Sequence, residues 1–160
     1  MHNIPTTLYS EIHEIMPIIC VDCVISVDNK ILLVKRKCEP MSGAWWFPGG
    51  RLTKNERLNT AMSRIVKSET GLDLSRPVML GHDETKFEAD PFGHGAGTHT
   101  VNFVYASRVS EMAMMRMALD SNHIECSTFS FEEIYQSDMH SYIKKFTALS
   151  EGVFNNSAVF

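Results

Sequence analysis

The segment from Pro48 to Leu72, PGGRLTKNERLNTAMSRIVKSETGL, constrains the fold of this chain more than any other stretch. Between Glu56 and Thr70 its apolar residues recur every three or four positions, which places them on one face of an α-helix. Gly71 follows as a helix stop. The sequence therefore predicts an amphipathic helix over residues 56–70 that packs one face against a core.

Runs of β-branched and aliphatic residues on both sides of this segment predict β-strands. Residues 17–28 and 31–36 form two such runs, and the tripeptide DNK has turn chemistry, so we expect a β-hairpin. Further strands are expected in the stretches WWF, RPVMLGH, THTVNFVYASRV and ECSTFSF. The glycines and the proline of residues 88–97 predict a mobile loop between two of these strands.

The last part of the chain predicts more helix. Ser130 and Glu133 have the spacing of a capping box, and SYIKKFTAL has helical spacing. The methionines of EMAMMRMAL are expected to pack in the core or along a helix, because methionine fills irregular gaps. The order strands, helix, strands, helix predicts an α/β (α+β mixed) fold, with a mixed β-sheet and helices packed against it.

Length and charge limit the possible classes of protein. A chain of 160 residues with 44% apolar content predicts one domain over residues 1–160. The net charge of -4 and the pI near 5.9 argue against a nucleic-acid partner. No stretch approaches the roughly 18 to 20 apolar residues of a membrane span, and the N-terminus does not read as a signal peptide. We therefore expect a soluble, cytoplasmic protein without a membrane partner.

Four cysteines are few for a disulfide scaffold of this length, so we expect reduced thiols. Cys20 and Cys23 form a C-x-x-C pair within a strand-like run, where residues three apart point to opposite faces. Such a pair cannot jointly bind a metal, and buried thiols are the better interpretation.

The opening segment resembles the Nudix box, whose pattern is G-x5-E-x7-R-E-U-x-E-E-x-G-U with U aliphatic. The matching positions, at the same spacing, are Gly50, Glu56, Arg64, Glu69, Gly71 and Leu72. This resemblance implies a Nudix fold, with the box at residues 48–72 and an N-terminal arm at residues 1–16.

The box pattern places three carboxylates at helix positions i, i+3 and i+4, where they can share divalent cations. Here those positions hold Ile65, Ser68 and Glu69, so one strong ligand remains. Within the Nudix superfamily this loss is similar to that of GDP-mannose mannosyl hydrolases. The stretches PIICVDC, ILLVKR, GAWWFPGGRL, THTVNFVYASRV and NHIE also resemble those enzymes in the same order.

That resemblance implies a metal-dependent hydrolase in which water attacks the anomeric carbon of a nucleotide sugar and releases the nucleoside diphosphate. GDP-mannose is the first candidate, before GDP-glucose and GDP-fucose. The resemblance also implies a homodimer and one Mg²⁺, or alternatively Mn²⁺, per active site. The implied metal ligands are the carbonyl of Gly49, the carboxylate of Glu69 and the amide oxygen of Asn122, where the family has glutamine.

The resemblance assigns the general base to His123, and an imidazole suits proton abstraction near neutral pH. Glu125 stays open as an alternative base or as a partner of His123. The resemblance also assigns Arg36, Arg51 and Arg64 to the diphosphate or to the organisation of the site. For Arg64, an ion pair with Glu56 that braces the helix is the competing interpretation.

Three further residues correspond to substrate-binding positions of the family: Tyr9 in the arm, Asp22 and His99. Asp22 could instead be a paired polar group within its apolar strand, and His99 could pair with a neighbouring strand residue. A family tyrosine that touches the diphosphate corresponds to Thr100, and a family aromatic to Ala44, which leaves the base and the sugar open.

Two other functions compete with this hypothesis. An ordinary Nudix pyrophosphohydrolase would act at phosphorus on a nucleoside diphosphate derivative, with Glu56, Glu69 and Glu125 gathering the cations. A nucleotide-binding module without turnover would also fit the reduced set of carboxylates.

Overall fold

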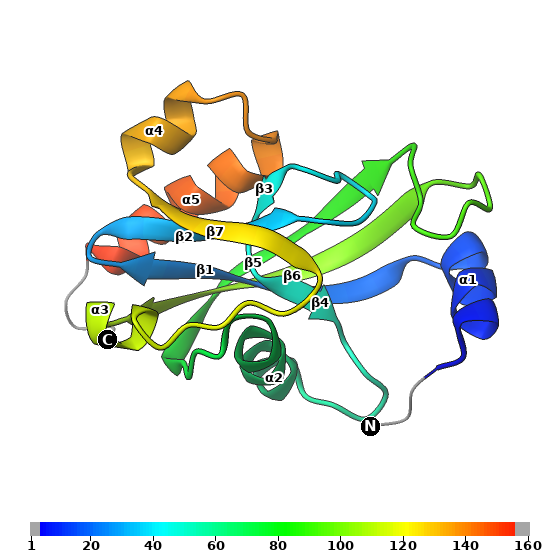
Figure 1. Cartoon of the computed structure of the whole chain (residues 1–160), viewed down its shortest axis with the longest axis horizontal. Helices are drawn as coiled ribbons and strands as arrows, with labels where there is room; N and C mark the ends of the chain where they lie inside the picture. Colours follow the sequence, from blue (N-terminus) through cyan, green and yellow to red (C-terminus); the bar gives the residue numbers. More distant parts are fainter. Residues whose placement is uncertain (1–3, 156–160) are drawn as a thin grey trace.

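The computed structural model describes residues 4–155, which fold around one mixed sheet (Figure 1). The strand order is β3-β2-β1-β6-β5, with β4 paired to β1 and β7 paired to β2. The strands are β1 (Ile18–Val27), β2 (Lys30–Arg36), β3 (Trp45–Trp46), β4 (Gly49–Arg51), β5 (Ser75–Phe87), β6 (Thr98–Val109) and β7 (His123–Phe129). The predicted mixed sheet is confirmed, since β1 runs parallel to β6 while the other pairs are antiparallel.

The predicted hairpin joins β1 to β2. Asp28 and Asn29 both have positive φ, at 50° and 59°, and Val27 pairs with Lys30 across the turn. Two consecutive left-handed residues characterise the tight turn whose twist matches that of the strands. Past this hairpin β2 leaves β1, and β4 pairs with β1 in its place, at Cys20 and Asp22.

Helices cover both faces of the sheet, as predicted (Figure 1). On one face lies α2 (Leu58–Thr70), which buries Ala61, Met62, Ile65 and Val66 in one apolar cluster. On the other face lie α4 (Phe131–Gln136) and α5 (Ser141–Phe154), which pack over a second cluster. Gly71 ends α2 in the left-handed conformation, and Ser130 with Glu133 forms the predicted capping box of α4.

Each face of β1 and β6 takes alternate residues. Val24 and Val104 lie under α5, and Cys23 and Tyr105 lie on the α2 side. Toward the start of both strands the α5 face carries polar residues, such as Asp22 and Asn102. The functional site begins where α5 stops covering this face.

Several expectations need correction. The arm contains a helix that the sequence did not predict, α1 (Thr6–Ile15). The methionine run holds the short helix α3 (Glu111–Met114), and Met114 and Met117 pack against the α2-side cluster. Met112 and Met115 are 71% and 85% exposed, so the packing prediction was wrong for these two, which lie on the outer side of a short turn.

The loop at residues 88–97 is more organised than its glycines suggested. The carboxylate of Asp90 accepts hydrogen bonds from the backbone N–H groups of Phe92, Gly93, His94 and Gly95. These bonds hold the pKa of Asp90 at about 2, although burial opposes them. The Asp90 carboxylate thus accepts hydrogen bonds from backbone N–H groups of a loop that has no strand partner.

The four cysteines, which all lie in the described part of the chain, are free, as predicted. Cys23 is buried, whereas Cys20, also predicted to be buried, is only partly buried. Between residues 4 and 155 no helix combines the length and the apolar character needed to cross a membrane.

Candidate active site

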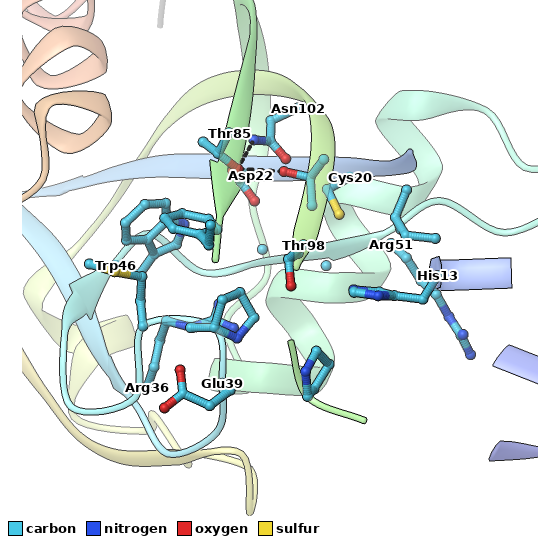
Figure 2. Close-up of a pocket in the computed structure, with 18 of the residues that line it drawn as sticks. His13, Cys20, Asp22, Arg36, Glu39, Trp46, Arg51, Thr85, Thr98 and Asn102 are labelled. Atoms are coloured by element: carbon cyan, nitrogen blue, oxygen red, sulfur yellow. Dashed lines mark hydrogen bonds between the residues drawn. The ribbon is translucent and has the colours of Figure 1, made fainter. Parts of the chain in front are cut away.

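A cavity of about 270 Å³ opens at the uncovered start of β1 and β6 (Figure 2). The lining comes from α1, β1, the end of β2 with the loop that follows it, β3, β4 and the β5–β6 hairpin. The lining residues include Tyr9, His13, Cys20, Asp22, Arg36, Glu39, Trp46, Gly49, Arg51, Thr98, Thr100 and Asn102. The structure therefore brings together Tyr9, Asp22, Arg36 and Arg51, the predicted substrate-binding residues other than His99.

Asp22 forms part of the cavity wall and is only 5% exposed. The hydroxyl of Tyr142, on α5, donates a hydrogen bond to Asp22 Oδ2. Burial raises the pKa of Asp22 to about 6, and the bond from Tyr142 partly offsets this. Gly49 passes so close that a Cβ there would lie 1.8 Å from Asp22 Oδ1, so only glycine fits.

Two arginines stand at opposite sides of the cavity (Figure 2). Arg36 Nε donates to the carbonyl of Pro40 at 2.8 Å. The guanidinium of Arg51 lies 4.2 Å from the ring centre of Tyr9, and its buried Nη1 has no hydrogen-bond partner among residues 4–155. A buried N–H without an acceptor is costly, so this group suits an anionic oxygen of a ligand.

Arg64, predicted as catalytic, is already engaged elsewhere. It contacts Glu56 through two bonds, Nε to Oε1 at 2.7 Å and Nη2 to Oε2 at 2.8 Å, and it donates to the carbonyl of Arg51 at 3.2 Å. These bonds lower the pKa of Glu56 to about 2, with help from Thr53. The ion pair of the competing interpretation is present, and Arg64 does not line the cavity. The catalytic role of Arg64 stays a prediction.

Glu69 lies in the last turn of α2, and its Oε2 accepts a hydrogen bond from the backbone N–H of Gly49 at 3.0 Å. Burial, with nearby Asp120 and Asp22, raises the pKa of Glu69 to about 8, against the stabilising Gly49 N–H. The two other box positions supply no carboxylate: Ile65 has no ligand atom and is buried in the core, and Ser68 has only a neutral hydroxyl at an exposed position.

The donor set fits a single hard cation. Among the described residues, no three His, Cys, Asp or Glu side chains cluster as metal ligands. Burial raises the pKa of Glu69, so the surroundings of this side chain disfavour its negative charge. A divalent cation beside Glu69 would stabilise that charge. Neutral oxygens such as the Gly49 carbonyl and the Asn122 amide are suitable companions for Mg²⁺.

His123 begins β7, and its side chain is only 8% exposed. Its Nε2 lies 3.9 Å from Glu69 Oε2, and its Nδ1 lies 2.8 Å from Oδ1 of Asp120. Asp120 also binds the Asn122 amide, with Nδ2 at 2.8 Å from Oδ2. The sequence analysis missed Asp120, although an aspartate shortly before an Asn-His pair is a signal for a side chain turning back on its own loop.

Two candidates lie away from this site. Glu125, the alternative base, is 51% exposed and pairs with Lys35 at 2.9 Å. His99 does not line the cavity and pairs with Glu84 at 3.3 Å, as its strand position favoured. Its neighbours Thr98 and Thr100 do line the cavity, because successive strand residues point to opposite faces. The structure therefore does not support His99 as a substrate-binding residue.

The arm helix closes one end of the cavity. Tyr9 and His13 on α1 pack edge-on against Phe92, and His13 Nδ1 lies 2.8 Å from His94 Nε2. Burial, then His94, lowers the pKa of His13. The predicted arm residue Tyr9 therefore reaches the cavity from its own chain, through contacts with the organised loop.

Comparison with known proteins places this architecture in context. The family model described as NUDIX domain matches residues 16–149. The low-salt glycan biosynthesis protein Agl8 of Haloferax volcanii is 29% identical over 149 residues, which cover 90% of this chain and 88% of that protein. An ADP-ribose pyrophosphatase of Methanocaldococcus jannaschii is 41% identical over 78 residues, which are 49% of this chain and 46% of that protein.

Solved structures show the same fold. The Nudix domain of Shewanella oneidensis NrtR, crystallised with ADP ribose, superposes with a TM-score of 0.69 at 16% identity, covering 94% of this chain and 99% of that one. A MutT protein of Methanosarcina mazei superposes with a TM-score of 0.68 at 24% identity, covering 86% of this chain and 96% of the other. At such low identity the likeness concerns the fold alone.

Proposed function

Because the chain belongs to the NUDIX family, we propose that it is a divalent-cation-dependent hydrolase that cleaves a nucleotide sugar at the anomeric carbon, with GDP-mannose as the first candidate. One observation carries the proposal: an oriented histidine, His123, lies beside Glu69, the last carboxylate of the box helix. Pyrophosphate chemistry with several cations needs more carboxylates than this helix keeps. Proton transfer from water needs one positioned base.

The proposal uses residues of the cavity wall together with Glu69, Asn122 and His123. These three do not line the cavity, and Glu69 adjoins it through its hydrogen bond with Gly49. Arg51, with its unpartnered Nη1, and Arg36 bind the diphosphate oxygens and stabilise the negative charge that grows as the diphosphate leaves. Glu69, the Gly49 carbonyl and the Asn122 amide would hold the cation, which when bound would add positive charge beside the leaving group. Asp22 faces the cavity as an acceptor for a sugar hydroxyl.

The proposed reaction is a one-step hydrolysis with His123 as the general base. His123 Nε2 accepts a proton from water as the water oxygen bonds to the anomeric carbon. The bond from that carbon to the diphosphate oxygen breaks, and the electron pair leaves with the nucleoside diphosphate. The sugar is released with inverted configuration, because attack and departure occur on opposite faces.

A homodimer, implied by the resemblance, is part of the proposal and is testable by light scattering.

The experiment is hydrolysis of GDP-mannose with Mg²⁺ in ¹⁸O-labelled water, followed by mass analysis of both products. We expect the label in the sugar and GDP as the nucleotide product. Label in a phosphate product would overturn attack at carbon. A screen of GDP-glucose, GDP-fucose and other nucleotide sugars, with Mg²⁺ and with Mn²⁺, then defines the substrate range.

A second candidate is attack at phosphorus. The local similarity to an ADP-ribose pyrophosphatase favours it, although the matched region spans less than half of that relative. ADP-ribose included in the same labelling experiment separates the two, because cleavage at phosphorus releases AMP. A nucleotide sugar that raises the melting temperature, but gives no product with either cation, would indicate a binding module instead.

A further inference from the structure

Both carboxylate oxygens of Asp120 form hydrogen bonds with Asn122 and His123. Oδ1 lies 2.8 Å from His123 Nδ1 and accepts the backbone N–H of Asn122 at 2.9 Å. Oδ2 accepts the Asn122 side-chain amide at 2.8 Å. An ionised carboxylate can only accept hydrogen bonds, so a neutral imidazole in this contact carries its single proton on Nδ1. Its Nε2 then has a free lone pair.

The main chain holds this carboxylate in place. The N–H of Asp120 donates to the carbonyl of Glu69 at 3.0 Å, and the N–H of Ala118 donates to the carbonyl of Thr70 at 3.0 Å. The N–H of Lys37, just past β2, donates to the carbonyl of Asn122 at 3.0 Å. The loop is therefore tied to the end of α2 and to the end of β2, and Asp120 acts from a fixed position.

The same carboxylate orients a second group. Because Asn122 Nδ2 bonds to Asp120, the amide carbonyl oxygen is directed away from that carboxylate. Asparagine is one methylene shorter than glutamine, so this bond sets where the shorter side chain presents its oxygen. A single residue thus determines the direction of both the imidazole and the amide.

We propose that Asp120 is a positioning residue, which keeps His123 in the tautomer with Nε2 unprotonated and holds the Asn122 amide with its nitrogen toward Asp120. The catalytic part of this inference rests on the proposed function. The tautomer and the orientation do not, since they follow from contacts within the chain. An imidazole with its proton on Nε2 cannot accept a proton from water at that atom. Loss of the Asp120 carboxylate should therefore lower the catalytic rate strongly.

The test is Asp120→Asn, with Asp120→Ala as a second variant and Asp73→Asn as the matched control. Asp73 is an exposed carboxylate whose ion pair with Lys67 lies outside the cavity. ¹⁵N NMR of the neutral histidines in the metal-free protein reports the tautomer without any substrate. We expect the Nδ1–H form of His123 in the wild type and in Asp73→Asn, with a shift toward Nε2–H in both Asp120 variants.

Turnover provides the second readout. We expect kcat on the active nucleotide sugar to fall by roughly a hundredfold to ten-thousandfold in Asp120→Asn, with KM changed far less. An unchanged tautomer in both folded Asp120 variants would overturn the inference, whatever the activity. If no nucleotide sugar is hydrolysed but the tautomer shifts as expected, the proposed function fails and the positioning role stands.

Discussion

The two ends of α2 hold their carboxylates in opposite electrostatic states. Glu56, just before the helix, receives two bonds from Arg64 and two from Thr53, which lower its pKa to about 2. Glu69, in the last turn, is buried with one backbone donor and two nearby carboxylates, and its pKa rises to about 8. The first is satisfied by the fold itself, whereas the second has no hydrogen-bonded Lys or Arg among residues 4–155.

The contrast gives opposite dependences of stability on pH. The lowered pKa of Glu56 contributes stability that is present above its ordinary value of 4.5 and is lost as pH falls toward 2. The raised pKa of Glu69 contributes stability that is present below 4.5 and is lost as pH rises toward 8 in the metal-free protein. One carboxylate therefore stabilises the fold near neutral pH, and the other is retained at a cost to stability.

The largest expected effect comes from Glu69→Gln, which keeps the volume but removes the anionic ligand. We expect turnover to fall by several orders of magnitude, because the cation loses its one strong ligand. We also expect the metal-free variant to melt above the wild type, increasingly so as pH rises from 4.5 to 8. Thermal unfolding in chelator and saturating-metal kinetics measure both, with Ser68→Ala on the exposed side as control. Normal turnover at saturating Mg²⁺ would place the cation elsewhere.

His123→Gln should come next. Loss of a positioned base costs roughly a hundredfold to ten-thousandfold in maximal rate. Binding of the nucleoside diphosphate should change little, because Arg36 and Arg51 remain. Rates with saturating substrate at fixed metal check this, and near-normal turnover in the variant would assign the base to another group.

Ile65→Glu with Ser68→Glu restores the missing box carboxylates. Ile65 is 4% exposed in the α2-side cluster, so a charge there should cost roughly 2 kcal/mol or more of unfolding free energy. We expect tighter Mn²⁺ binding by calorimetry without efficient pyrophosphatase activity. Ser68→Glu alone, at an exposed position, is the control for added charge and should unfold like the wild type. Efficient pyrophosphate hydrolysis by the double variant would show that the cavity already suits attack at phosphorus.

The smallest effect is expected for Glu56→Gln. Loss of the charge that pairs with Arg64 should destabilise the protein by about 1 to 2 kcal/mol at neutral pH. The difference from the wild type should shrink as pH falls below 4.5, where the wild-type carboxylate is progressively protonated. Denaturant unfolding at several pH values measures it, with Asp73→Asn as an exposed ion-pair control. A difference that stays constant down to pH 2 would mean that packing, and not charge, is responsible.

Local patterns predicted local structure well. The hairpin turn at Asp28, the helix end at Gly71 and the capping box at Ser130 all depend on contacts within a few residues, so the sequence alone sufficed. The pair of Glu56 and Arg64 was also foreseeable, because a spacing of eight residues brings the loop before α2 against the helix. Strand parity places His99 opposite Thr98 and Thr100, but only the structure shows that the two threonines face the cavity.

The arrangement of the site required the tertiary structure. Tyr142 donates to Asp22 from a helix that follows 120 residues later, and Asp120 reaches the box helix through main-chain bonds. No periodicity encodes such contacts, because they join segments whose proximity is set by sheet order.

The residue types that carry the chemistry, and the absence of two box carboxylates, can be read from the chain as written. Whether a given side chain acts is decided by what surrounds it in the folded protein. Arg64 and Arg51 are the same residue type within one segment, yet Arg64 forms two hydrogen bonds with Glu56. Arg51 has a buried Nη1 for which residues 4–155 provide no partner. Burial and pairing set that difference, and both depend on packing between distant segments.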